Sequence, residues 1–353
     1  MVDAVAQAKL LQPRVELAIG GKLYAGWTSV SVTRSLDTVS GTFELALTEK
    51  AKADDAPFPI LPGDPCTLLI DGATVINGFV DLVAPSIGAD DHSIMVSGRD
   101  RTADLADCSA IHKPGSWRNT KIEAIAAELA KPFGVRVSAK VSTGAVIPKF
   151  ALQPGESVQA AIERLLRFRG LLMVANAEGD LDIITPEDGA PVAVLQYGAN
   201  LLTGSARHDH RERFSAYRIK GQAAGDDTKS GKTVSQLSGS ATDPGVTRYR
   251  PLLIVAEEQG DGASLATRAK WEAGVRAGKS IAADITVLGW QTAPGGALWR
   301  PNMPVRVVAA PLQLADRTML VTAVTLTKDD AGTIATLTVM PPEAWKQLAE
   351  KAK

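Results

Sequence analysis

The sequence is poor in cysteine, in aromatic side chains and in net charge, and each shortage excludes a class of function. Two cysteines, Cys66 and Cys108, stand among 353 residues, which excludes a disulfide framework and a cysteine-bound zinc site and fits a reducing cytosol. The formal net charge is -1, so the chain as a whole does not attract nucleic acid, although a local basic face remains open. Aromatic residues make up 5%, which leaves few side chains for stacking bases.

Long apolar runs are absent as well. The longest, LLMVA at 171–175 and LLIVA at 252–256, are far too short to span a bilayer. The opening MVDAVAQAKLLQPRVEL lacks a basic segment followed by a long apolar core, so we expect no signal peptide. These features predict a soluble protein made in the cytoplasm, without membrane insertion, and the length suggests two or three domains.

The first hundred residues contain short stretches of alternating apolar residues. RVELAIGGKLYAGW alternates and then turns at Gly20-Gly21, and CTLLIDGATVINGFVDLV turns at Asp71-Gly72. Short strands separated by frequent glycine turns are typical of a β-barrel or a β-sandwich. We therefore expect a β-domain over residues 1–108.

The hydrophobic period changes to that of helices in the middle of the chain. TKIEAIAAELAKPFG predicts a helix that begins with a capping box of Thr120 and Glu123 and ends at Pro132 and Gly134. GESVQAAIERLLRFRG predicts a second helix, and LLMVANAEGDLDIIT predicts a β-hairpin. Residues 109–200 are therefore expected to form a small α/β domain.

The strand pattern returns after Gly198. A polar segment over 221–245 has little to bury and is predicted to be mobile, and a further helix is predicted over 263–277. The predicted fold class is α+β, mainly β. Two barrel domains, at 1–108 and 201–340, flank the α/β domain at 109–200, and a polar tail follows at 341–353.

A faint internal repeat supports the idea of two similar β-domains. Pro65 and Pro304 each open a strand pattern and lie 239 residues apart. Pro62 precedes an acidic turn at Asp90 by 28 residues, and Pro301 precedes one at Asp329 by the same number. Because proline-led strands and acidic turns are common in β-proteins, the repeat is a hypothesis that the strand order can test.

No motif for catalysis or ligand binding has the spacing that its chemistry requires. GDDTKSGKT (225–233) and GVRAGKS (274–280) have five and three residues between the glycines, whereas a phosphate loop needs four. His208 and His210 are expected on one face of a strand, where two histidines without an evident third ligand favour a solvated surface over a metal site. Paired acids at 54–55, 90–91, 226–227 and 329–330 fit turns. We expect no catalytic residue, no metal and no cofactor.

The stretch VSGRDRTADLADC (96–108) gathers charges of both signs. Contact with nucleic acid is disfavoured because its acids cancel its arginines, and catalysis is disfavoured because a base or nucleophile is missing. The pattern favours a structural corner in which arginines pair with acids and Thr102 caps a short helix with Leu105 and Cys108 facing inward. The motif residues are Arg99, Asp100, Arg101, Thr102, Asp104 and Asp107.

Three segments carry a resemblance to a known family. They are VSGRDRTADLADCSA (96–110), FALQPGESVQAAIERLLRFRGLLMVANAEGDLDI (150–183) and the pair GWQTAPGGALWRPNMPVRVV (289–308) and MLVTAVTLTKDDAGTIATLTVMPPEAW (319–345). Together they resemble the contractile-tail baseplate hub proteins of Mu-like phages, related to the late-control D group. The match runs in order along nearly the whole chain.

The resemblance implies a structural protein of the virion, without enzymatic activity, assembled in the host cytoplasm. Two tube-type β-barrel domains in each subunit of a homotrimer would form a pseudo-six-fold ring. That ring would join the hexameric tail tube protein to the trimeric central spike protein, contact other baseplate proteins and line the channel through which phage DNA passes in transit. The polar segment 221–245 and the tryptophans Trp290 and Trp299 are candidate interface elements, and packing of both indoles inside the second barrel is the alternative.

Three other functions remain open from the sequence. A hub of a headless, bacteriocin-like tail or of a secretion spike would have the same fold. A tail-associated cell-wall hydrolase would need a clustered acid pair or a metal site. A monomeric barrel that binds oligosaccharide or nucleic acid would need an exposed aromatic platform.

Overall fold

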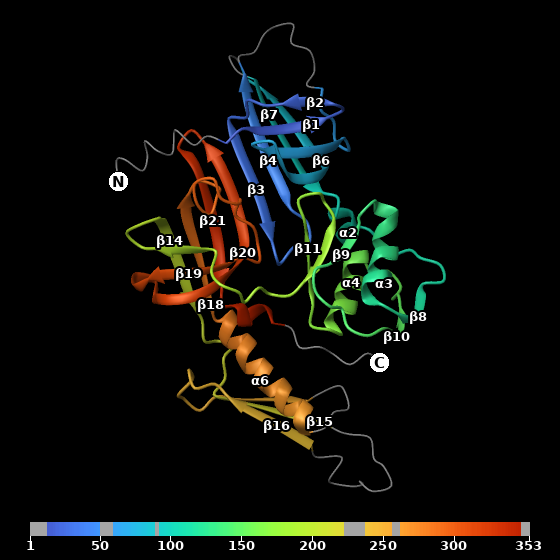
Figure 1. The fold of residues 1–353 in the computed structure, drawn as a ribbon, viewed down its shortest axis with the longest axis vertical. Coiled ribbons are helices and arrows are strands. Elements are labelled where there is room, and N and C mark those ends of the chain that lie inside the picture. Colours follow the sequence, from blue (N-terminus) through green and yellow to red (C-terminus); the bar gives the residue numbers. More distant parts are fainter. Residues whose placement is uncertain (1–12, 50–58, 89–91, 222–236, 256–261, 347–353) are drawn as a thin grey trace.

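The computed structural model describes residues 13–49, 59–88, 92–221, 237–255 and 262–346. Strands dominate it, and the few helices lie mainly in the middle of the chain, so the predicted mainly β, α+β class is confirmed (Figure 1). No helix in these ranges is both long enough and apolar enough to cross a membrane.

The first barrel is built from strands that each bury one side. Val15, Leu17 and Ile19 alternate into the core, and Gly20 and Gly21 take the positive φ angles, 57° and 77°, that the predicted turn requires. All neighbouring strands are antiparallel, in the order β3-β4-β7-β6-β5-β1-β2. The strands are β1 (Val15–Ile19), β2 (Lys22–Tyr24), β3 (Ser29–Ser35), β4 (Thr42–Glu49), β5 (Pro65–Ile70), β6 (Ala73–Ile87) and β7 (His92–Asp100).

The second barrel continues the same sheet. Its order is β14-β18-β21-β20, with β19 on β20 and β13 on β19, and β20 joins β3 of the first barrel from Ala323↔Ser35 to Lys328↔Val30. Its elements are β13 (Ala193–Gln196), β14 (Leu201–His208), β18 (Ile281–Leu288), β19 (Pro304–Ala309), η2 (Ala310–Leu312), β20 (Leu314–Asp329), β21 (Gly332–Met340) and η3 (Pro342–Trp345).

The predicted repeat is present in the strand order. Six strands of the first barrel, β3-β4-β7-β6-β5-β1, have counterparts in the order β14-β18-β21-β20-β19-β13. Pro65 and Pro304 open the equivalent strands β5 and β19. The outermost pair differs, because β1 is antiparallel to β5 whereas β13 is parallel to β19.

A bulge falls at the same place in both barrels. β6 pairs with β7 through Val80 and then Leu82, skipping Asp81. β20 pairs with β21 through Val321 and then Ala323, skipping Thr322. A bulge bends a strand and changes the direction of its side chains. The two barrels therefore share this local distortion as well as the strand order.

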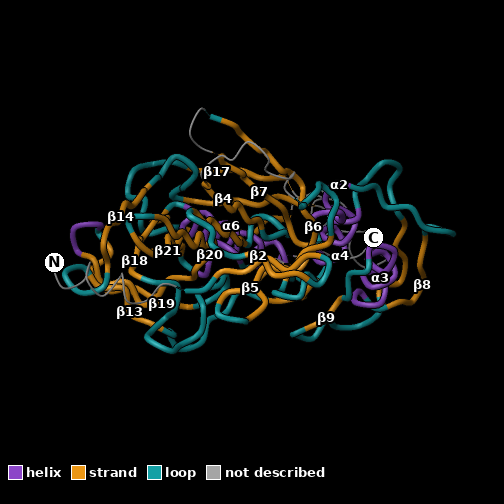
Figure 2. The backbone as a smooth tube through the Cα atoms, turned by 90° about the horizontal axis from the view of Figure 1, so that it is seen from above, coloured by secondary structure: helices purple, strands orange, loops and turns teal. Residues whose placement is uncertain are grey.

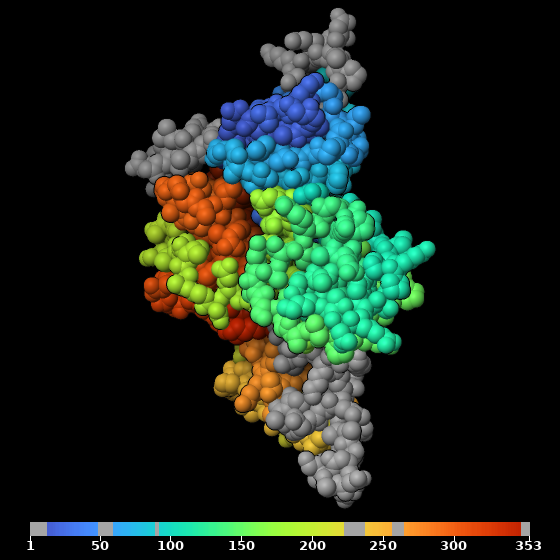
Figure 3. Space-filling view, turned by 45° about the vertical axis from the view of Figure 1, so that its right-hand side comes forward, coloured from blue at the N-terminus to red at the C-terminus, as the bar shows by residue number. Residues whose placement is uncertain are grey.

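A middle body follows the first barrel and packs beside both barrels (Figures 2 and 3). Its helices α3 and α4 bury their apolar sides against each other and against the strands of this body. Its elements are α2 (Ala103–Asp107), β8 (Ser116–Thr120), α3 (Ile122–Ala130), η1 (Lys131–Phe133), β9 (Val137–Ala139), β10 (Ile147–Ala151), α4 (Val158–Arg167), β11 (Leu172–Ala175) and β12 (Leu181–Ile184).

The start of α3 differs from the sequence expectation. The residue before the helix is Lys121, and the hydroxyl of Thr120 donates to the carbonyl of Arg118, so the predicted capping box is wrong. Glu123 instead accepts a hydrogen bond from the hydroxyl of Thr143. The Glu123 carboxylate therefore bonds to Thr143, which is distant in the sequence, instead of capping the helix.

An insertion separates β14 from β18 in the second barrel, where the first barrel has only the short β3–β4 connection. It is a small sheet, β16-β15-β17, covered by helix α6, and it extends away from both barrels (Figure 1). Gly239 allows the close approach of helix and sheet, because a Cβ there would lie 2.1 Å from the Ala266 nitrogen. The elements are β15 (Ala216–Gly221), β16 (Leu237–Thr242), β17 (Pro251–Val255) and α6 (Gly262–Lys279).

The insertion corrects part of the expectation for 221–245. Residues 237–242 form strand β16 instead of belonging to a mobile loop. Residues 222–236 of the predicted loop lie outside the described residues. The predicted helix at 263–277 is present as α6.

Candidate functional site at the first barrel corner

The motif at 96–108 forms the corner where β7 leaves the first barrel and α2 begins. Arg99 lies on the surface between two acids, with its Nε 2.7 Å from the Oδ2 of Asp81 and its Nη2 2.9 Å from the Oδ2 of Asp107. These bonds raise the pKa of the Arg99 guanidinium, so Arg99 stays charged. Asp81 comes from the bulge in β6, outside the motif, so no pattern within the motif indicates this partner.

Asp100 is the buried member of the motif, with a residue exposure of 2%. Its carboxylate accepts bonds from the Gly41 backbone N–H at 2.5 Å, the Thr102 backbone N–H at 3.0 Å and the Thr102 hydroxyl at 2.5 Å. Burial raises the pKa of Asp100 even though these bonds act in the opposite direction. Asp100 therefore fixes the turn into α2 through backbone donors and does not form the expected ion pair with an arginine of the motif.

Arg101 ties the barrel to the middle body. Its Nη1 donates to the Gly134 carbonyl at 3.2 Å and its Nη2 to the Glu178 carbonyl at 2.5 Å, with the Asp180 carboxylate 3.6 Å away. Gly179 lies directly on β6, where a Cβ would come within 2.2 Å of the Asn77 carbonyl oxygen. The corner thus holds two bodies in one arrangement.

The remaining parts of the motif follow the prediction in part. Residues 103–107 form the expected short helix, and Leu105 is buried. Thr102 precedes the helix but makes no side-chain cap, because its hydroxyl is bonded to Asp100. The expectation that Cys108 faces inward is wrong, since Cys108 is exposed at the end of α2 while Cys66 is buried.

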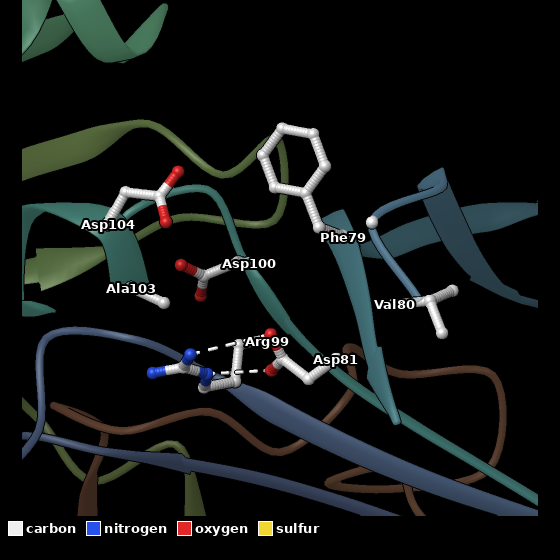
Figure 4. Close-up of a pocket in the computed structure, with 8 residues that line it drawn as sticks. Phe79, Val80, Asp81, Arg99, Asp100, Ala103 and Asp104 are labelled. Atoms are coloured by element: carbon white, nitrogen blue, oxygen red, sulfur yellow. Dashed lines mark hydrogen bonds and ion pairs between the residues drawn. The ribbon is translucent and has the colours of Figure 1, made fainter. Parts of the chain in front are cut away.

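A pocket of about 320 Å³ opens at this corner (Figure 4). Asp104, from the first turn of α2, lies on the opposite side of the pocket from Arg99 and Asp81. Asp104 forms no ion pair with any other described residue. The lining consists of Gly63, Phe79, Val80, Asp81, Arg99, Asp100, Ala103 and Asp104.

The other candidate residues lie elsewhere. Trp290 and Trp299 are buried in the core of the second barrel, which is the packing alternative left open by the sequence. The Trp290 Nε1 donates to the carbonyls of Thr327 and Ile334 inside that barrel. Large apolar side chains that are exposed occur instead at Leu82 and Ile87, in the second half of β6.

The histidine pair is not on one strand face, so that expectation is wrong. His208 ends β14 with its Nε2 2.9 Å from the Leu312 carbonyl oxygen, and His210 lies beyond the strand with its Nε2 3.0 Å from an Arg213 nitrogen. No group of three or more metal-ligating side chains occurs within the described ranges. The charged side chains at the first barrel corner pair with one another and bond to backbone groups.

The near-miss phosphate loops and the paired acids have structural positions or fall outside the structure. Gly278 and Lys279 end α6, and Gly278 packs against η3, where a Cβ would lie 2.4 Å from the Ala344 nitrogen. Asp329 and Asp330 stand at the turn between β20 and β21. The segments 225–233, 54–55, 90–91 and 226–227 lie outside the described residues.

The whole fold matches solved tail proteins. The 43 kDa tail protein of prophage MuSo2 from Shewanella oneidensis superposes with a TM-score of 0.85 and 35% identity, covering 95% of this chain and 100% of that chain. The tail protein from Neisseria meningitidis MC58 superposes with a TM-score of 0.79 and 22% identity, covering 96% and 99%. An Escherichia coli type VI secretion component shares only the fold, at 13% identity and a TM-score of 0.55, covering 92% and 76%. The fold defines a phage tail protein.

Comparison with family models identifies the family of the chain. Matches are to the Mu phage baseplate assembly protein GpP-like N-terminal domain (residues 14–100), the baseplate hub protein gp44-like second domain (102–185) and the GpP fourth domain (262–348). The baseplate hub protein gp44 of Escherichia phage Mu is 38% identical over 336 residues, covering 93% of this chain and 87% of that protein. The chain belongs to the Mu-like phage baseplate hub family and is a component of the phage tail baseplate.

Proposed function

We propose that this chain is a non-enzymatic hub subunit that forms a closed ring of three copies between tail tube and spike. In the ring, two barrels from each copy supply six similar units. The proposed units are the ranges 1–108 and 201–340 for the barrels and 109–200 for the middle body. The proposal rests on two unpaired strand edges, one in each barrel. The equivalent two edges pair with each other inside the chain and join its two barrels.

The closed version of this junction lies in the middle of the chain. There the second half of β20, residues 323–328, pairs with β3, residues 30–35. The repeat makes β6 the counterpart of β20 and β14 the counterpart of β3. One junction between the two barrels is therefore already made within each copy.

The open version consists of the two counterpart edges. The second half of β6, residues 82–87, pairs with β7 on one side, and β14 pairs with β18 on one side, with no other described strand beside them. Leu82, Ile87 and Leu202 on these edges are 45%, 78% and 46% exposed. Figures 1 and 2 draw β14 and β6 well apart, β14 in the second barrel and β6 in the first.

Open strand edges with exposed apolar side chains favour pairing with another chain. Because the two edges differ, copies would join head to tail, and such contacts close into a ring when the rotation permits. Pro85 lies in the β6 edge and lacks an N–H, so the ladder between copies would form without a donor there. The number three follows from the family resemblance.

The same ring would enclose the DNA exit channel. The near-zero net charge of the chain suits a wall that DNA slides past, because several basic phosphate contacts would retain it. Assembly in the host cytoplasm before incorporation into the virion completes the proposal. A hub of a headless tail or a secretion spike would use the same ring, and the neighbouring genes distinguish these settings.

Light scattering over a concentration series tests the ring. The wild-type protein is expected to show the mass of three chains, alone or with its spike protein present. Ile87→Asp in the open edge should shift the protein to monomer, because a charge would be desolvated in the junction. The matched control is Val255→Asp, at an exposed apolar residue on β17 of the insertion, which should leave the mass unchanged. A monomer at every concentration, with and without the spike, contradicts the proposal.

A further inference from the structure

The pocket at the first barrel corner has a filled counterpart in the second barrel. There Leu36, just beyond the end of β3, donates its backbone N–H to the Thr322 carbonyl at 2.8 Å, directly on the bulge of β20. Its side chain belongs to a small buried cluster with Leu320 and Trp345. The end of the joining strand therefore covers the corner of the barrel that it joins.

The two corners are built alike. The Gly63 N–H donates to the Val80 carbonyl at 2.8 Å in the first barrel, and the Asn302 N–H donates to the Val321 carbonyl at 2.8 Å in the second. Both bonds lie one residue before the bulge. The repeat accordingly aligns Leu320, Thr322 and Trp345 of the covered corner with Phe79, Asp81 and Asp104 of the pocket.

The strand pairings also identify the segment that corresponds to Leu36. They align Val30 of β3 with Gly204 of β14, because the partner strands β4 and β18 occupy equivalent places in the two barrels. Leu36 lies six residues after Val30, and the residue six positions after Gly204 is His210. His210 is exposed and lies just beyond β14, at the open edge.

The side chains at the two corners change together. The covered corner pairs apolar Leu36 with apolar Leu320 and Trp345. The pocket instead presents Asp81 and Asp104, and the segment 207–211, Arg-His-Asp-His-Arg, presents two arginines and two histidines against one acid. Asp209 of this segment is paired with Arg211 at 2.6 Å, and in the pocket Arg99 is held between Asp81 and Asp107. The segment is basic and the pocket acidic, so their charges are complementary.

We propose that the pocket receives the segment 207–211 of the neighbouring copy, with His210 in the place that Leu36 takes within the chain. The His210 N–H then meets the Asp81 carbonyl, and its imidazole lies against Phe79 and Asp104. This inference rests on the proposed ring and specifies which groups join its subunits. It also gives the motif at 96–108 a second role, because the acids of the corner serve as a receptor for the next subunit.

A disulfide between copies tests the contact. Asp104→Cys combined with His210→Cys, in a Cys108→Ser background, should give covalent dimers and trimers under mild oxidation, since both positions are exposed or partly exposed in the single copy. The matched control combines Asp104→Cys with Thr203→Cys on the same edge strand. Thr203 lies seven residues before His210, roughly 20 Å along an extended chain, so cross-linking should drop at least tenfold.

Charge reversal supplies an independent measurement. His210→Asp should raise the concentration needed for half assembly at least tenfold, and adding Asp104→Lys to it should restore most of the loss. Circular dichroism of each variant checks that the fold is intact. If the three-chain mass persists, but the disulfide fails and His210→Asp has no effect, the contact is wrong and the ring stands. If no variant and no wild-type sample assembles, with or without the spike protein, the ring and the contact are both wrong.

Discussion

The two corners of the molecule solve one geometric problem in different ways. Each barrel has the same strand order and the same bulge, and each must leave its last strand through a short helical turn. The second corner is closed within the chain by apolar packing of Leu36 and Trp345. The first is held by a buried carboxylate and keeps a charged pocket open. In the proposed ring, this difference leaves the first corner free to join the next copy.

The largest effect is expected at the buried acid of the first corner. Asp100→Ala removes an acceptor that satisfies the backbone donors of Gly41 and Thr102 and the Thr102 hydroxyl. Leaving such buried donors unpaired should lower the free energy of unfolding by about 4 kcal/mol. Urea denaturation measures it, with Asp104→Ala as the control at less than about 0.5 kcal/mol. Equal effects of the two variants would contradict the account of Asp100.

The pH dependence of that acid has a definite sign. Because burial raises the pKa of Asp100, the carboxyl group takes up a proton at a higher pH in the native state than in the unfolded chain, where its ordinary pKa is about 4. Its contribution to stability is therefore fully present below that pH and is lost as the pH rises towards the folded value. Asp100→Asn should remove this loss, so the stability difference between wild type and variant should shrink from pH 4 to pH 7. A widening difference would contradict the raised pKa.

The second largest effect is expected at the covered corner. Leu36→Ala removes a buried side chain from the cluster with Leu320 and Trp345, which should cost about 3 kcal/mol. His210→Ala is the matched variant at the equivalent position, and it should leave the stability of the single copy unchanged while weakening assembly. Thermal unfolding and light scattering on the same samples separate the two. A stability loss in both variants would erase the difference between the corners.

A smaller effect should come from the close approach of β6 to β7. Gly78→Ala places a Cβ 1.9 Å from the Arg99 carbonyl oxygen, and the backbones must separate, at about 2 kcal/mol. The equivalent residue of the second barrel is Met319, which pairs with Val305 of β19, whereas β21 ends at Met340 and has no residue opposite Met319. Gly189→Ala, with open space around its Cβ, should change unfolding by less than about 0.5 kcal/mol. If Gly78→Ala and Gly189→Ala have the same urea midpoint, the close approach of β6 to β7 is refuted.

The smallest effect is expected for the surface pair. Arg99 is about one-third exposed, and exposed ion pairs contribute at most about 1 kcal/mol. Arg99→Ala should therefore change the unfolding free energy by less than that, and raising the salt concentration should reduce the change further. Urea curves at low and high salt provide the measurement. A loss comparable with that of Asp100→Ala would mean that the surface pair holds the corner.

Patterns within one element predicted more of the fold than of the site. The alternation of Val15, Leu17 and Ile19 and the glycines that follow were enough for a strand and its turn, because both depend on neighbouring residues. The proline offset between Pro65 and Pro304 predicted the repeat, since each opens the same strand of its barrel. The short helix after β7 followed from its local pattern as well.

The contacts that sequence patterns did not predict join residues that lie far apart along the chain. Asp100 bonds to Gly41 and Glu123 to Thr143, so a local pairing or cap gave the wrong partner for each. The insertion sheet was hidden because its strands pair across residues that read as a polar loop. An available signal was the break in alternation at Asp81, after which Leu82 and Ile87 of β6 are exposed.

Image averages of the assembled protein viewed along its axis test the central claim most directly. We expect a closed ring with three-fold symmetry and six similar lobes around a central channel, because each chain supplies two barrels of the same strand order. Three lobes, an open filament or isolated single copies would contradict it, since each means that the open edges of β6 and β14 do not repeat the junction between β20 and β3.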